Sequence, residues 1–252
     1  MSDHIPFKNE IRYLETNPSK PYVFVLGHSW VNRFPINLFS TEIVENYNFL
    51  FHSETNIPTL IKALNQFPIR FPQYPSIIFV FTGANDLYFL PNDLSKFKLQ
   101  FAQLDQKLKQ AYPWTKIVYG QLEFRYYKPN RSRYYDPKKV AAYETNSCRF
   151  NKWLKNQITG GRIGNKIFIT RSPIAFRKPH FDWDGVHLNP QAYSVFVSLV
   201  EKFLRKTTLC LEIPAGPPPF LVICHNLSKC SNCNFKLNIQ VVNSVNEILT
   251  RK

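Results

Sequence analysis

The stretch Tyr22–Trp30 reads Tyr-Val-Phe-Val-Leu-Gly-His-Ser-Trp and decides the fold class of this chain. Four of its first five residues are aromatic or β-branched, which is typical of a buried strand. The glycine after them allows a sharp turn, so Ser29 is expected where a strand gives way to a helix. A hydroxyl there is well placed to act as a nucleophile, although a lone serine at such a point is more often a helix N-cap.

Apolar runs of this kind recur along the chain and alternate with helical patterns. Further strands are expected at residues 48–51, 76–81, 116–120 and 166–169. Helices are expected at residues 60–67, at 97–111 after a cap at Asn92, Asp93 or Ser95, and after the pairs Asp136-Pro137 and Asn189-Pro190. Strands that alternate with helices indicate a parallel sheet covered on both faces, with ligands bound beyond the carboxyl ends of its strands.

A second polar motif, Gly83-Ala84-Asn85-Asp86, follows the strand expected at 76–81. The Asn85 amide is therefore expected at the same edge of the sheet as Ser29, where it could donate a hydrogen bond to a developing oxyanion. Taken alone, these residue types more often form a turn. The position after a buried strand is what favours a functional role.

A third motif, Asp184-Gly185-Val186-His187, precedes the last predicted helix. Its carboxylate and imidazole are close enough in sequence for Asp184 to orient His187 as a general base toward Ser29. A simple turn is the alternative, as is a metal cluster with His180 and Asp182. No second set of ligands has a recognisable spacing, so no metal site is predicted.

These motifs resemble the SGNH or GDSL hydrolase superfamily, whose blocks are Gly-Asp-Ser, a second-block glycine, Gly-x-Asn-Asp and Asp-x-x-His. Three of the four blocks can be placed in family order between residues 20 and 206. The resemblance implies a three-layer α/β/α fold with a parallel, flavodoxin-like five-stranded sheet. It also implies a triad of Ser29, His187 and Asp184, an oxyanion hole of Asn85 and the Ser29 backbone N–H, and no cofactor.

The chain departs from the family pattern at two places. His28 replaces the usual aspartate, and no glycine matches the second block, where the backbone N–H of Ser53 is the nearest substitute. His28 is expected to hydrogen-bond within the rim and not to act as the base, because adjacent residues in an extended turn point apart. A Gly-His-Ser first block resembles a divergent subgroup that includes esterase-like domains of some LINE-type retrotransposon proteins.

The charge of the chain suggests an anionic partner. The formal net charge is +15 over 252 residues, which raises attraction to nucleic acid, anionic membrane or acidic substrates. Basic residues alternate with tyrosines around Arg125, Lys128, Arg131 and Arg133, a pattern that could hold phosphates and stack on bases. The alternative is a solvated basic loop.

The expected organisation is an N-terminal extension at 1–19, a hydrolase-like domain at 20–208 and a tail with prolines and cysteines at 209–252. No stretch approaches the roughly 18 uninterrupted apolar residues of a membrane helix. Five cysteines, an odd number, do not suggest a disulfide framework, so an intracellular protein, cytoplasmic or nuclear, is expected. Zinc in the tail is an alternative to unpaired thiols, with ligands from Cys224, His225, Cys230 and Cys233.

Two functions from different classes are therefore open. The first is a serine esterase that hydrolyses a small acetyl or short acyl ester through Ser29, His187 and Asp184. The second is a catalytically weak domain of the same fold that binds nucleic acid or serves as a scaffold, which the charge and the missing glycine favour.

Overall fold

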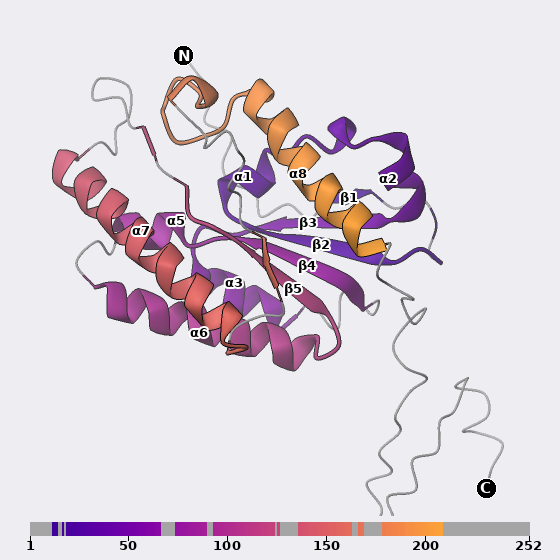
Figure 1. The fold of residues 1–252 in the computed structure, drawn as a ribbon, viewed down its shortest axis with the longest axis horizontal. Coiled ribbons are helices and arrows are strands. Elements are labelled where there is room, and N and C mark those ends of the chain that lie inside the picture. Colours follow the sequence, from indigo (N-terminus) through magenta and orange to yellow (C-terminus); the bar gives the residue numbers. More distant parts are fainter. Residues whose placement is uncertain are drawn as a thin grey trace, which may run out of the picture. The chain divides into compact units, whose positions relative to one another are not determined.

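The computed structural model describes residues 12–14, 17, 19–66, 74–89, 93–123, 125–126, 136–162, 166–168 and 178–208. Within them, helices cover both faces of a six-stranded sheet (Figure 1). The strands are β1 (Arg12–Leu14), β2 (Tyr22–Gly27), β3 (Asn48–Ser53), β4 (Pro75–Phe81), β5 (Lys116–Gly120) and β6 (Lys166–Phe168).

The sheet has the order β1-β3-β2-β4-β5-β6, and every pair from β3 to β6 is parallel. The expected parallel α/β fold is confirmed. The number of strands differs from the expected five because β1, within the segment expected to be an extension, pairs antiparallel with β3. Three residues are too few to carry a recognisable alternation, which is why the sequence pattern missed this edge strand.

Helices follow most strands at their carboxyl ends. They are α1 (Ser29–Asn32), α2 (Thr41–Asn46), α3 (Ile57–Leu64), α5 (Ala84–Phe89), α6 (Leu94–Ala111), α7 (Pro137–Thr159) and α8 (Pro190–Thr208), with short 3-10 helices at Ile36–Leu38 and Lys178–His180. Asp136 caps α7 by accepting hydrogen bonds from the Lys138 and Lys139 backbone, and Asp93 caps α6. The cap and proline signals therefore located the starts of these helices correctly.

Alternate residues of the central strands divide the core into two layers. On β2, Phe24 and Leu26 pack with residues of α3, α6 and α7, whereas Val23 and Val25 pack with residues of α1, α2 and α8. Both faces of the strand are completely covered, which explains why its sequence is apolar throughout.

The strand order places a switch point between β2 and its two neighbours, because β2 is followed along the chain by β3 on one side and then by β4 on the other. Loops after β2 and β4 therefore diverge at the carboxyl edge, which is where doubly wound sheets bind ligands. Ser29 and Asn85 lie immediately after these two strands. The fold thus brings the first and third sequence motifs to one edge.

Several predictions from the sequence fall outside the described residues. These concern Phe67, Asn92 and Ile169 at element ends, the cations Lys128, Arg131 and Arg133, and the whole tail at 209–252 with its candidate zinc ligands. In the part of the chain that is described, no helix combines the length and apolarity needed to cross a bilayer.

Candidate active site

Ser29 is the first residue of α1, directly after the turn that ends β2. The N-cap is His28, whose Nδ1 accepts a hydrogen bond from the Trp30 backbone at 3.5 Å, so Ser29 is not the helix cap. Gly27 is required here because a Cβ at this position would collide with the Phe81 carbonyl of β4. The close approach of β2 and β4 therefore sets the position from which Ser29 projects.

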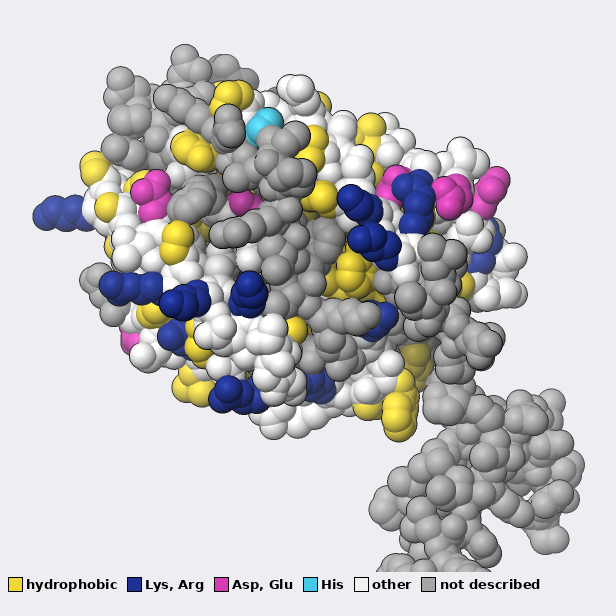
Figure 2. All heavy atoms as spheres, viewed as in Figure 1, with side chains coloured by type: hydrophobic (Ala, Val, Ile, Leu, Met, Phe, Trp, Pro, Cys, Tyr) yellow, Lys and Arg dark blue, Asp and Glu magenta, His cyan; other side chains and the backbone are white. Residues whose placement is uncertain are grey.

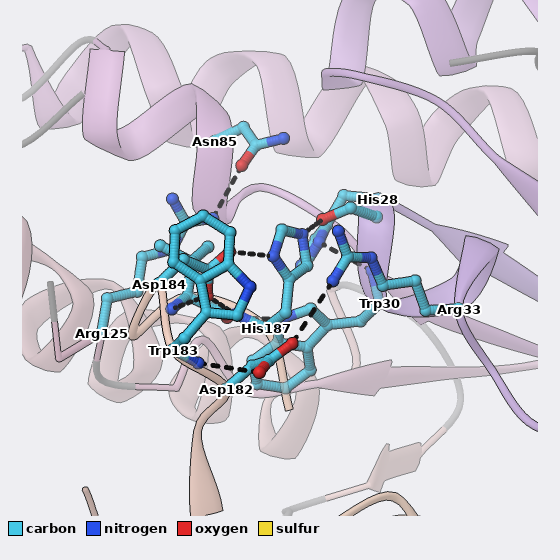
Figure 3. Close-up of polar contacts among 11 residues, drawn as sticks. His28, Trp30, Arg33, Asn85, Arg125, Asp182, Trp183, Asp184 and His187 are labelled. Carbon is cyan, nitrogen blue, oxygen red and sulfur yellow. Dashed lines mark hydrogen bonds and ion pairs between the residues drawn. The ribbon is translucent and has the colours of Figure 1, made fainter. Parts of the chain in front are cut away.

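The side chains of Asp184 and His187 point toward each other (Figure 3), and the His187 ring also reaches Ser29. His187 Nε2 lies 2.9 Å from Ser29 Oγ, and His187 Nδ1 lies 2.5 Å from Asp184 Oδ2. The second carboxylate oxygen of Asp184 accepts hydrogen bonds from the Val186 and His187 backbone at 2.9 and 3.0 Å. The three residues, predicted from two separate motifs, are joined by a continuous series of hydrogen bonds.

The position of the protons in this series of hydrogen bonds follows from the environment of Asp184. Burial raises the pKa of Asp184, but the hydrogen bond and charge of His187, with two backbone N–H groups, outweigh burial and lower it to about 2. The carboxylate is therefore ionised at neutral pH and can only accept. His187 Nδ1 must then carry the proton, which leaves Nε2 to accept the Ser29 hydroxyl proton.

The loop that carries Asp184 and His187 is held by hydrogen bonds from two other segments of the chain. Gly185 has φ +71°, a conformation that favours glycine, and its carbonyl accepts from the Tyr126 backbone at 2.8 Å. The Trp30 indole Nε1 donates to the Val186 carbonyl at 2.9 Å. Trp30 thus links the helix that begins with Ser29 to the residue beside His187.

Asn85 lies in the first turn of α5 and not in a turn outside regular structure. Its Nδ2 donates to the Thr55 carbonyl at 2.9 Å, and its Oδ1 accepts from Arg125 at 2.7 Å. An amide nitrogen carries two hydrogens, so Thr55 accepts one and the second can serve another acceptor. The amide is therefore compatible with the predicted donor role, and its orientation is set by two partners.

Arg125 is the site residue that sequence reasoning misplaced. It was expected among surface cations for nucleic acid, but its side chain is 4% exposed and packs near the rings of Tyr88 and Tyr143. Exposed lysines and arginines instead spread over the layer of α6 and α7 (Figure 2). A usable signal existed, because Arg125 follows the end of β5 by five residues and so falls at the functional edge.

Ser53 and Asp86 occupy the remaining motif positions near Asn85. Ser53 ends β3 in register with Gly27, and it is buried. Asp86 Oδ1 accepts from the Ile57 backbone at 2.9 Å and so braces the start of α3. Asp86 therefore acts as a structural link between α5 and α3.

His28 lines a cavity of about 20 Å³ together with Thr82, Ala84 and Arg125. Burial, with the charges of Arg125 and His187, holds the pKa of His28 well below its usual value, so the ring is neutral. The cavity has room for about one water molecule or one small group. No cluster of three or more histidine, cysteine or acidic side chains suited to a metal occurs among the described residues.

Comparisons with known proteins give no match to a family model or to a curated protein. Solved structures do match. A member of the lipolytic G-D-S-L family from Veillonella parvula aligns with 73% of this chain and 98% of its own, with a TM-score of 0.55 and 15% identity. A carbohydrate esterase of family 3 from Talaromyces cellulolyticus aligns with 76% of this chain and 100% of its own, with a TM-score of 0.54 and 13% identity.

A GDSL-like lipase from Bacteroides thetaiotaomicron aligns with 75% of this chain and 89% of its own, with a TM-score of 0.53 and 16% identity. At these identities the likeness establishes the fold: this chain has the α/β fold of the GDSL or SGNH hydrolases, as its motifs predicted. The likeness to retrotransposon domains stays a prediction.

Proposed function

We propose that this protein is a serine esterase that hydrolyses acetyl or short acyl esters. The observation that carries the proposal is the hydrogen-bonded chain from Ser29 Oγ through His187 to Asp184. A carboxylate, an imidazole and a hydroxyl in this order are the parts of a nucleophile with its general base. The fold shared with lipolytic and carbohydrate-esterase structures supports the same class of reaction.

The reaction follows from these positions. Ser29 Oγ attacks the ester carbonyl while its proton passes to His187 Nε2, and Asp184 stabilises the resulting imidazolium. The negative carbonyl oxygen is held by the second N–H of Asn85 and by the backbone N–H of Ser29, with the N–H of Ser53 as a third candidate donor. His187 returns the proton to the departing alcohol, and water then attacks the acyl-enzyme by the same relay.

A short acyl group is favoured by the cavity beside His28 and Ala84. These residues adjoin Ser29 and Asn85, and about 20 Å³ of space admits a methyl-sized group but not a long chain. Activity should therefore fall steeply as the acyl chain of a chromogenic ester is lengthened from acetate to octanoate.

The experiment compares hydrolysis of a chromogenic acetate by the wild type, Ser29→Ala and His187→Ala. Each variant should lose at least about 10³-fold in kcat, because neither attack nor proton transfer remains. Ser198→Ala is a matched control, since this exposed serine on α8 hydrogen-bonds only within its helix to the Ser194 carbonyl in the described part of the chain. Equal rates for the wild type and both variants would overturn the proposal.

A second candidate function, binding of nucleic acid, is favoured by the exposed cations of α6 and α7. They are Lys96 on α6 and Lys138, Arg149, Lys152 and Lys155 on α7, with Arg162 three residues after the end of α7. Polyanion binding through such residues should weaken steeply with added salt and be unchanged in Ser29→Ala. Filter binding of single-stranded RNA at two salt concentrations tests this, and absent or salt-insensitive binding would remove it.

A further inference from the structure

Arg125 is a buried cation that contacts the amide of Asn85 and the rings of two tyrosines. One guanidinium nitrogen donates to Asn85 Oδ1 at 2.7 Å. The guanidinium carbon lies 5.3 Å from the ring centre of Tyr143 and 6.0 Å from that of Tyr88. Aromatic rings on α5 and α7 therefore restrict the guanidinium plane, so that its donor is aimed before any substrate arrives.

The contact with Arg125 decides which way the Asn85 amide faces. A guanidinium has only donors, so it can meet the amide oxygen but not the amide nitrogen. The nitrogen must then face the opposite side, where Thr55 accepts one of its hydrogens at 2.9 Å. An amide rotated by a half turn would set its oxygen against the Thr55 carbonyl and its nitrogen against the guanidinium, so both contacts would be lost.

The same contact changes the strength of the Asn85 donor. A charged donor on the amide oxygen withdraws electron density from the amide, so its N–H groups become better donors, as in any cooperative hydrogen-bond chain. This matters here because no glycine matches the second block of the SGNH motifs, and Ser53 is the nearest substitute. An oxyanion hole with a changed second position depends more heavily on the donor that remains.

We propose that Arg125 is a positioning residue for the oxyanion hole: it orients and polarises the Asn85 amide so that its second N–H is presented to the tetrahedral intermediate. The inference rests on the esterase function proposed above and adds a residue that the family motifs do not contain. Arg125 also lines the cavity assigned to the acyl group, but its proposed effect on the reaction passes through Asn85.

The test is a double-mutant cycle on hydrolysis of a chromogenic acetate, with Arg125→Met, Asn85→Ala and both together. Arg125→Met should lower kcat by about 10- to 100-fold and leave KM within about 3-fold, because the donor acts on the transition state. In the Asn85→Ala background the same change should lower kcat by less than about 3-fold, because the amide it acts through is absent. Lys202→Met, at an exposed lysine on α8, is the matched control and should behave as the wild type.

A merely structural role would give a different result. It would lower the melting temperature and reduce kcat by the same factor in both backgrounds, and either that equality or an unchanged kcat overturns the inference. Should Arg125→Met fail to fold by circular dichroism, Arg125→Lys takes its place in the cycle with the same criterion. A wild type without Ser29-dependent turnover would overturn the proposed function as well, so the two failures are distinguishable.

Discussion

The candidate site consists of two halves that the chain holds in different ways. The relay half, made of Ser29, His187 and Asp184, is joined by direct hydrogen bonds between motif residues. The oxyanion half, centred on Asn85 and Ser53, is held by partners outside the motifs, chiefly Arg125 and Thr55. The contacts of the relay half therefore run between motif residues, whereas the Asn85 amide of the oxyanion half is oriented by residues outside the motifs.

The difference shows which contacts of the site can be predicted from sequence motifs and which cannot. Asp184 and His187 are so near in sequence that the loop alone brings them into contact. The oxyanion half draws on α5, on the segment after β3 and on the segment after β5, so its geometry depends on packing between distant elements. A replaced residue there can be compensated by another from anywhere in the fold.

The largest expected effect tests the relay half. Asp184→Asn should lower kcat by about 10⁴-fold at pH 7.5, because the amide no longer fixes the tautomer in which His187 Nε2 accepts a proton. Steady-state hydrolysis of a chromogenic acetate measures this loss. A loss below about 10-fold would mean that the hydrogen bond at 2.5 Å does not orient the base.

The relay half should also have a distinct pH dependence of stability. Because the folded-state pKa of Asp184, about 2, lies below the unfolded value of roughly 3.9, its ionisation stabilises the folded protein above pH 4. That contribution is lost as pH falls from about 4 through 2. Urea unfolding of wild type and Asp184→Asn between pH 5 and pH 3 should show a steeper loss in the wild type.

Asp86, next to Asn85, should change the free energy of unfolding with pH in the opposite direction to Asp184. Burial raises the pKa of Asp86 to about 6, although backbone hydrogen bonds and the charge of Arg125 act against it. Between about pH 4 and 6 the unfolded chain loses this proton first, so the free energy of unfolding falls as pH rises, by up to about 3 kcal/mol. Asp86→Asn should lack this decline in urea unfolding at pH 4.5 and 7.5, and parallel profiles would contradict it.

A smaller effect is expected at the contact that braces the relay half. Trp30→Phe removes the indole donor to the Val186 carbonyl, which should cost about 1 kcal/mol and lower kcat by about 10-fold through a less ordered His187. Trp114→Phe is the control, because this tryptophan is 72% exposed and lies before β5 at the opposite end of the strand. Equal kinetics of both variants would show that the loop needs no such brace.

The smallest effect is expected when Ser53, the nearest substitute for the unmatched second-block glycine, is changed to glycine. Ser53→Gly should change kcat by less than about 3-fold, because the described residues include no non-glycine residue with positive φ, so Ser53 is not strained. Both residues offer the same backbone N–H. A rise of kcat above about 10-fold would show that the side chain of Ser53 obstructs the proposed oxyanion hole. It would then be wrong that the contact between Arg125 and Asn85 compensates for the absent glycine.

Much of the fold was predictable because the central strands are buried on both faces and the helices begin at recognisable caps. The relay residues were predictable because each follows a strand or precedes a helix at the same edge. Arg125 was not, since its role depends on Tyr88 and Tyr143, which enclose it only in the folded chain. Local charge pattern indicated a surface segment, and tertiary packing placed this arginine inside.

The separation of Ser29 from His187 along the chain, 158 residues, fixes when the relay can first exist during synthesis. A nascent chain emerging from the ribosome can pair β2 to β5 and enclose much of the α6 and α7 layer before the base has been made. The helix that follows this loop, α8, adds contacts of Phe196 with Phe34 and Phe81 once it has emerged as well. The proposed relay is therefore among the last parts of the domain to form, and a chain that ends before His187 lacks the proposed base for Ser29.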